Sequence, residues 1–142
     1  MNSESTKNLA RRLFEECWGA GKVEVLQEVM AERHIFHLTE GDVEGREPYR
    51  GILEAYLRAF VPQFSFPHVI AEGDLAAVHY VEAGRFAGVW TIGEKEIQPT
   101  GKAYQTFGVE LIRVQGGRIV ESWPGHGALA QYSQIGIVKI EG

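Results

Sequence analysis

The period of the hydrophobic pattern changes about halfway along the chain, and this change limits the fold more than any other feature. In the first part, apolar residues recur every three or four positions, which predicts helices over residues 5–18, 23–30 and 48–60. Ser5 or Thr6 can cap the first helix, and Pro62 ends the last. Between the second and third helices we expect a short strand at 34–38 and a charged loop up to Pro48.

In the second part, apolar and polar residues alternate, as they do in strands that expose one face. The alternation predicts strands over residues 75–81, 85–92, 104–114 and 118–123. The last two flank Gly116 and Gly117, and two consecutive glycines favour a tight hairpin because glycine accepts positive φ. Helices followed by an antiparallel meander predict an α+β fold.

The composition fits one globular domain and argues against several classes of function. The 142 residues are 44% hydrophobic and 23% charged, without an internal repeat or a linker, so we expect a single domain over residues 1–142. The one cysteine, Cys17, allows neither an internal disulfide nor a multi-cysteine zinc site. With 14 basic and 19 acidic residues the net charge is −5, which argues against a nucleic-acid partner.

A membrane or export signal is not expected either. No apolar run approaches the roughly 20 residues that cross a bilayer. The first residues lack the basic segment and apolar core of a signal peptide. We therefore expect a cytoplasmic protein that does not bind membranes.

Several short motifs follow one another through the second half of the chain. They are Glu72-Gly-Asp74, Gly84 with Gly88, Pro99-Thr-Gly-Lys102, Ile112-Arg-Val114, Gly117-Arg-Ile-Val-Glu-Ser-Trp123 and Gln134-Ile-Gly136. In this order the chain resembles, over roughly residues 5–137, the SnoaL-like polyketide cyclases and ester cyclases of the nuclear transport factor 2-like superfamily. The resemblance implies a cone-shaped, cystatin-like barrel, in which N-terminal helices pack on a strongly curved, mostly antiparallel sheet around an apolar pocket. It also implies subunits that pair through the outer face of the sheet.

The chain departs from that family at the positions that matter for chemistry. The family pattern places the acid/base aspartate of polyketide cyclisation four residues beyond the tryptophan of its Glu-x-Trp motif. Here that position is Gly127, with His126 just before it. A strand arginine typical of relatives is replaced by His79. The resemblance therefore implies the scaffold, while any catalysis has to use other residues.

His126 and Glu110 are the candidate catalytic residues. His126 lies between glycines in Pro124-Gly-His-Gly127, and imidazole can take and return a proton near neutral pH. The alternative is a solvated loop histidine. Glu110 lies among apolar neighbours, where burial would raise its pKa and suit it to acid or base chemistry.

A hairpin turn at Gly116-Gly117 pairs residue 112 with 121 and residue 110 with 123, which assigns side chains to two faces. One face would carry Tyr104, Thr106, Glu110, Ile112, Ile119, Glu121 and Trp123. The other would carry Gln105, Phe107, Val109, Leu111, Arg113, Val120 and Ser122. Glu121 is open to a structural explanation, an ion pair with Arg113 or Arg118. The alternation alone leaves open which face lines the pocket.

The remaining histidines and aromatic residues are candidates for the pocket wall. His34, His37 and His79 invite a metal site, but His34 and His37 have the wrong spacing for one strand face and no carboxylate accompanies them, so we predict no metal. His37 and His79 are polar wall candidates, with a core or surface position as the alternative. Most aromatic residues belong to the core, and the candidates for ligand contact are Tyr104, Trp123, Trp90 and Phe107.

These features predict a small-molecule enzyme with an apolar pocket that performs cyclisation, isomerisation or hydrolysis by acid/base chemistry without a cofactor. Its ligand would be hydrophobic or aromatic, with Tyr104 or His79 donating to the developing oxyanion. The alternative is a non-catalytic protein that binds a small hydrophobic ligand, which the loss of the family aspartate favours. Because apolar residues occupy both faces of residues 104–123, we expect the uncovered face to form a homodimer.

Overall fold

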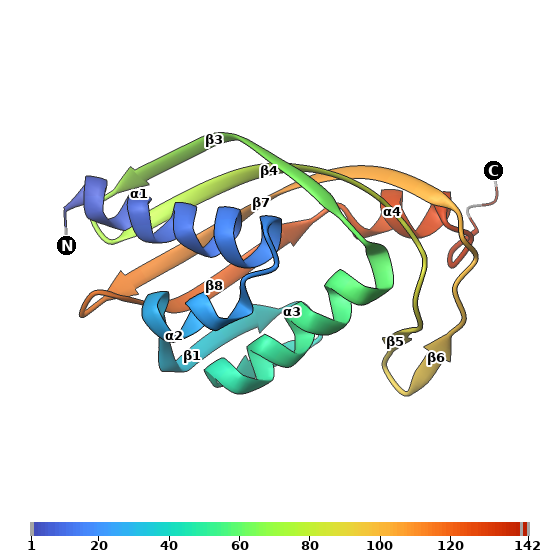
Figure 1. Cartoon of the computed structure of the whole chain (residues 1–142), viewed down its shortest axis with the longest axis horizontal. Coiled ribbons are helices and arrows are strands. Elements are labelled where there is room, and N and C mark those ends of the chain that lie inside the picture. Colours follow the sequence, from blue (N-terminus) through green and yellow to red (C-terminus); the bar gives the residue numbers. More distant parts are fainter. Residues whose placement is uncertain (1, 140, 142) are drawn as a thin grey trace.

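The helices lie on one side of a curved sheet in the computed structural model, which describes residues 2–139 and 141 (Figure 1). The helical elements are α1 (Ser3–Arg11), the π-helix that continues it over Arg12–Gly19, a 3-10 turn (Val23–Val25), α2 (Leu26–Val29), α3 (Arg46–Phe60) and α4 (Ala128–Gln134). The main strands are β1 (Met30–Leu38), β2 (Gly41–Glu44), β3 (Gln63–Glu72), β4 (Leu75–Arg85), β7 (Ala103–Gln115) and β8 (Arg118–His126).

These six strands form one sheet in the order β2-β1-β8-β7-β4-β3. All neighbours are antiparallel except β1 and β8, which run parallel. A separate two-stranded hairpin joins β5 (Trp90–Ile92) to β6 (Lys95–Ile97). The predicted α+β fold with a curved, mostly antiparallel sheet is confirmed, although the sheet is not closed into a barrel, since β2 and β3 form its two edges.

Two local predictions are wrong and one strand was missed. The expected loop at 39–48 contains β2, a short edge strand whose side chains stay mostly exposed. The expected strand at 85–92 breaks after β4, because the backbone N–H groups of Ala87 and Gly88 both donate to the carbonyl of Ala59 near the end of α3. β3 was not predicted, since a β-bulge between Ser65 and His68 interrupts its alternation.

The ends of the helices follow the sequence signals with one exception. Asn2 caps α1 instead of Ser5 or Thr6, and its Oδ1 accepts from the Ser5 N–H at 2.8 Å. α3 stops at Val61, which adopts a left-handed conformation just before Pro62. No helix in the described part of the chain has the length and apolar character to cross a membrane.

The β7–β8 hairpin turns at Gly116-Gly117 as predicted, but its register differs by one residue. A β-bulge after Arg113 leaves Val120 without a partner, so Glu110 faces Pro124 and Ile112 faces Ser122. As a result, the assignment of Glu121 and Trp123 to the Glu110 face is wrong. Both point to the outer face, and Ser122 points inward and is fully buried.

The inner face of the sheet supplies the core. β7 buries every second side chain from Tyr104 to Val114 against the helices. One core cluster contains Leu13, Tyr49 and Leu53 of the helices, and a second surrounds Phe60 at the end of α3. Between the two clusters lies the cavity that forms the candidate site.

Candidate functional site

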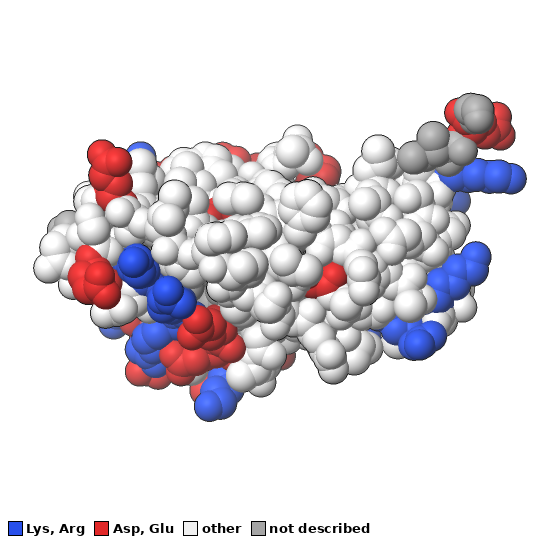
Figure 2. All heavy atoms as spheres, turned by 90° about the horizontal axis from the view of Figure 1, so that it is seen from above, with Lys and Arg blue, Asp and Glu red and all other residues white. Residues whose placement is uncertain are grey.

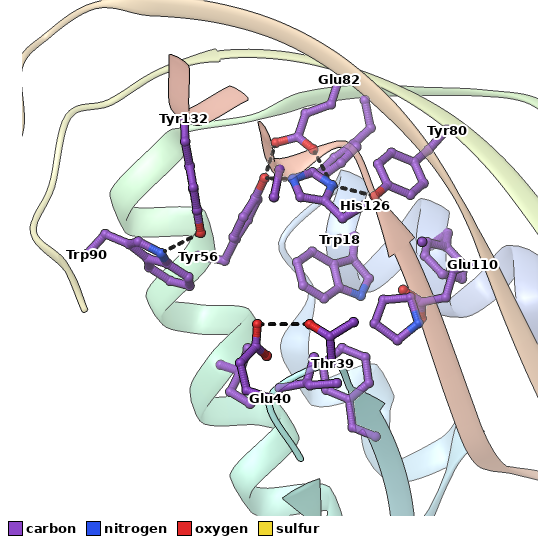
Figure 3. A pocket seen from close by; sticks show the side chains of 18 residues that line it. Trp18, Thr39, Glu40, Tyr56, Tyr80, Glu82, Trp90, Glu110, His126 and Tyr132 are labelled. Carbon is purple, nitrogen blue, oxygen red and sulfur yellow. Dashed lines mark hydrogen bonds and ion pairs between the residues drawn. The ribbon is translucent and has the colours of Figure 1, made fainter. Parts of the chain in front are cut away.

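A cavity of about 380 Å³ lies between the inner face of the sheet and the helices (Figure 3). This volume falls within the range of pockets that bind small organic molecules. Its wall is lined by Phe14, Trp18, Phe36, Leu38, Thr39, Glu40, Ile52, Tyr56, Phe64, Tyr80, Glu82, Trp90, Glu110, Pro124, Gly125, His126, Ala128 and Tyr132. Aromatic rings make up much of this wall, and its polar groups are three carboxyl groups, His126, Thr39 and the hydroxyls of the tyrosines.

Glu110 lies in this wall as an isolated acidic group. Its side chain is 5% exposed, and its Oε2 has no hydrogen-bond partner among the described residues. Burial raises the pKa of Glu110 to about 8, because a carboxylate loses its hydration in such a place. At neutral pH the group is therefore mostly a neutral carboxylic acid that a small change of surroundings can ionise.

His126 and Tyr80 lie on two strands separated by β7, and the β7 residue between them is Gly108. Tyr80 on β4, Gly108 on β7 and His126 on β8 are direct neighbours in register. A Cβ at position 108 would lie 2.4 Å from the Tyr80 hydroxyl. The glycine therefore leaves the space that the Tyr80 side chain needs to reach His126. Tyr80 Oη lies 2.5 Å from His126 Nδ1.

A chain of hydrogen bonds continues from the other nitrogen of His126. Its Nε2 lies 2.7 Å from the amide oxygen of Gln131, and the Gln131 amide nitrogen donates to the Tyr56 hydroxyl at 2.9 Å. Tyr56 in turn donates to Glu82 Oε2 at 2.5 Å. Since an amide oxygen only accepts, Nε2 carries the proton of the neutral ring, and Nδ1 accepts from Tyr80.

Glu82 is the last acceptor in this series of hydrogen bonds. It is 1% exposed, receives the hydroxyls of Tyr56 and Tyr104 on Oε2, and has its Oε1 4.0 Å from His126 Nδ1. Burial raises the pKa of Tyr80 above its usual range, so this hydroxyl keeps its proton. The arrangement joins a histidine, a protonated tyrosine and a buried carboxyl group beside an aromatic cavity.

Sequence reasoning missed Glu82, Tyr80, Tyr56 and Gln131. The signal for Glu82 was present, since β4 buries alternate residues from Ala76 through Tyr80, and a glutamate continues that register. The predicted strand ended at Val81, one residue too early to place Glu82 on the inner face.

The sequence model of the SnoaL-like domain matches residues 10–122. The chain belongs to the SnoaL-like family. No curated protein matches the sequence. Solved structures share the fold: a candidate SnoaL-like polyketide cyclase from Jannaschia sp. CCS1 is 24% identical with a TM-score of 0.83, over 96% of this chain and 95% of that one. TsrD from Streptomyces laurentii is 16% identical with a TM-score of 0.81, over 97% and 99%.

A third structure, the candidate polyketide cyclase IdmH from Streptomyces antibioticus, is 25% identical. Its TM-score is 0.73, over 92% of this chain and 98% of IdmH. This SnoaL-like chain has no room for a side chain at Gly127, where the sequence resemblance places the aspartate of the family pattern. A Cβ there would lie 2.4 Å from Thr106 Oγ1 and 2.7 Å from the Phe107 carbonyl oxygen.

Four predicted site residues lie at or beside the cavity of this SnoaL-like domain. His126, Glu110 and Trp90 line it. Tyr104 stands behind the wall, 2% exposed, and donates to Glu82 at 2.6 Å. Among the described residues, no hydrogen bond joins His126 to Glu110. His126 instead forms hydrogen bonds with Tyr80, Tyr56 and Gln131.

The other four predicted ligand contacts lie on the outer face of the sheet, away from this cavity. His37 bridges Asp42 and Glu121 at 2.9 Å each and stacks on Trp123 at 4.9 Å. The bulge in the hairpin explains why Trp123 points outward.

His79 and Phe107 share that outer face. The Nδ1 atoms of His79 and of His68 on the neighbouring strand are 3.0 Å apart, and the His79 ring is perpendicular to the Phe107 ring, with centroids 6.1 Å apart. His34, by contrast, is buried on the inner face beside Ser122, and burial lowers its pKa to about 4. The three histidines considered for a metal site thus have separate partners.

Proposed function

We propose that this SnoaL-like protein is a cofactor-free acid/base enzyme that acts on a small, largely apolar carbonyl compound. The observation that carries the proposal is that the Tyr80–His126 pair and the isolated Glu110 line the same aromatic cavity. Family membership and the candidate polyketide cyclases among the structural relatives support a small-molecule role.

Tyr80 and His126 would supply the acid. When His126 is neutral, the Tyr80 hydroxyl donates to Nδ1. When His126 is protonated, Nδ1–H donates to the tyrosine oxygen, and the hydroxyl is free to donate to a ligand. Glu82 Oε1, 4.0 Å from Nδ1, faces the positive charge of that second state.

Glu110 would supply the base. A pKa of about 8 leaves roughly a tenth of the groups ionised near pH 7. An ionised Glu110 has a free Oε2, and burial makes it a stronger base than a solvated carboxylate.

The proposed step moves one proton on each side of a substrate carbonyl. Glu110 takes a proton from the carbon next to the carbonyl, and the C–H electron pair becomes the double bond of an enol. The carbonyl oxygen takes the Tyr80 proton, and His126 passes its Nδ1 proton to Tyr80. In an enol conjugated with a second double bond, Glu110 returns its proton to the far carbon and the enol O–H proton goes back to Tyr80, which gives isomerisation. In cyclisation, the enol carbon bonds to the carbon of a second carbonyl, whose oxygen takes the proton held by Glu110, and the enol O–H proton returns to Tyr80.

A binding protein without catalysis is the second candidate function. Two observations favour it: Gly127 cannot carry the family aspartate without a backbone shift, and both nitrogens of His126 are already engaged within the protein. In that case the same cavity would hold its ligand unchanged.

Elimination of nitrobenzisoxazole separates these candidates. In this probe a base removes a ring C–H proton, the N–O bond breaks, and the phenolate oxygen that forms needs a donor. We expect His126→Asn and Glu110→Gln each to lower the rate about 10²–10⁴-fold. His37→Asn, the same substitution on the outer face, should leave it unchanged. A wild-type rate no faster than that of His126→Asn would favour the binding protein.

The outer face of the sheet supports a homodimer as part of this proposal. Ile70, Val81, Phe107, Val109 and Leu111 are exposed there, and cross-strand register places Val81 beside Phe107 and links Ile70 to Leu111 through Ala77. Figure 2 shows, from above, a side with few charged side chains over its middle and more toward its ends. A second copy of the chain would remove these apolar groups from water.

A further inference from the structure

Three aromatic rings from three elements meet at the end of the cavity near Glu40. Tyr56 of α3 and Trp90 of β5 stand nearly perpendicular, with ring centroids 5.6 Å apart and an angle of 88° between the planes. The Trp90 indole N–H donates to the Tyr132 hydroxyl of α4 at 3.1 Å. Figure 3 shows the Glu40 side chain beside Thr39, below the rings of Trp90, Tyr56 and Trp18 in this view.

Apart from His126 and the tyrosines, the ionisable groups of the cavity wall are all carboxyl groups. Glu40, Glu82 and Glu110 line it, and no lysine or arginine is among its described lining residues. Glu82 is bound by two tyrosine hydroxyls and Glu110 is buried, whereas Glu40 is exposed and accepts from the Thr39 hydroxyl at 3.1 Å. The pKa of Tyr132 is raised, mainly by burial and to a lesser degree by the charge of Glu40, which therefore lies within electrostatic reach of the Tyr132 hydroxyl.

Rings and carboxylate together favour a cation at this end. The face of an aromatic ring carries negative charge density, and several rings around one position bind alkylammonium groups well. Glu40 adds an exposed carboxylate to these rings. An anionic group placed here would be repelled by the same ring faces and by the same carboxylate.

We propose that the end of the cavity formed by Tyr56, Trp90, Tyr132 and Glu40 binds the ammonium group of an organic cation. The ligand of this protein is then a basic molecule with an apolar body. This inference rests on the proposed function in that it uses the same cavity. It assigns the charged group to the Glu40 end and leaves Glu110 and Tyr80 for the reacting carbonyl.

Binding of three probes with one ring system and different charges tests this inference. The probes are naphthylmethylamine as the cation, naphthylmethanol as the neutral form and naphthoate as the anion, each titrated by calorimetry. The cation should bind about three- to tenfold more tightly than the alcohol, and naphthoate most weakly. Glu40→Gln should bring the cation close to the alcohol and leave the alcohol unchanged. Trp90→Phe should weaken the cation more than the alcohol.

Glu44→Gln is the matched control, because Glu44 is an exposed glutamate of β2 outside the cavity wall. It should not change the ratio of the two affinities. The inference is overturned if the alcohol binds as tightly as the cation, if Glu40→Gln keeps the ratio, or if none of the probes binds. Elimination of nitrobenzisoxazole by the same preparation shows separately whether the proposed catalysis survives such a result.

Discussion

Replacing Glu110 with glutamine should change how the stability of the protein depends on pH. Burial raises the pKa of Glu110 from 4.5 to about 8 in the folded protein. Between these two values the folded state holds a proton that the unfolded chain has released, so stability falls as pH rises. At about 1.4 kcal/mol for each pH unit, the full loss is about 5 kcal/mol. Glutamine has no such proton, so the variant should escape this loss.

The assay is urea unfolding of the wild type and Glu110→Gln from about pH 5 to pH 9. The free energies of unfolding should be closest at the acidic end, where the pH is only slightly above the ordinary pKa of 4.5 and little of the loss has accumulated. The variant should become more stable by up to about 5 kcal/mol at the alkaline end, a large part of the stability of a domain of this size. Glu44→Gln, at an exposed position, should show no such trend. A constant difference between wild type and Glu110→Gln would refute the argument that burial holds Glu110 neutral.

Three further predictions use other parts of the structure. Gly108→Ala should lower the free energy of unfolding by about 1–3 kcal/mol, measured in urea, because its Cβ would lie 2.4 Å from both the Tyr80 hydroxyl and the Gly125 carbonyl; an unchanged stability would mean that β7 has more room than the register shows. Cys17 should react with a disulfide reagent near pH 8 far more slowly in the folded protein than in urea, because burial raises the pKa of its thiol to about 12; equal rates would contradict its burial. Phe107→Lys should reduce the mass in sedimentation from two chains to one, and a monomeric wild type would remove the homodimer.

The fold class could be predicted from the sequence because the signals that decide it are local. The change of hydrophobic period and the Gly116-Gly117 turn depend on residues close together in the chain, and both correspond to elements of the structure. The β-bulge after Arg113 leaves no comparable mark, since Val120 suits a regular strand as well as a bulge. One unpaired residue was enough to move Trp123 to the opposite face.

The site depends on contacts that sequence spacing does not reveal. His126 and Glu110 could be named from residue type and neighbours alone. The contact between Tyr80 and His126 requires β4, β7 and β8 to be in register at Gly108. That register depends on the pairing of β4 with β7 and β8, which come much later in the sequence. The link through Gln131 and Tyr56 joins α4 to α3 and follows only from the packing of the whole chain.

The central claim is that Glu110 and His126 act on one substrate in one cavity, and a double-mutant cycle tests it most directly. Nitrobenzisoxazole elimination is measured for the wild type, His126→Asn, Glu110→Gln and the double variant. If both groups serve the same step, each single variant loses about 10²–10⁴-fold, and the double variant is little slower than the worse single variant. Single variants that keep the wild-type rate would contradict the claim.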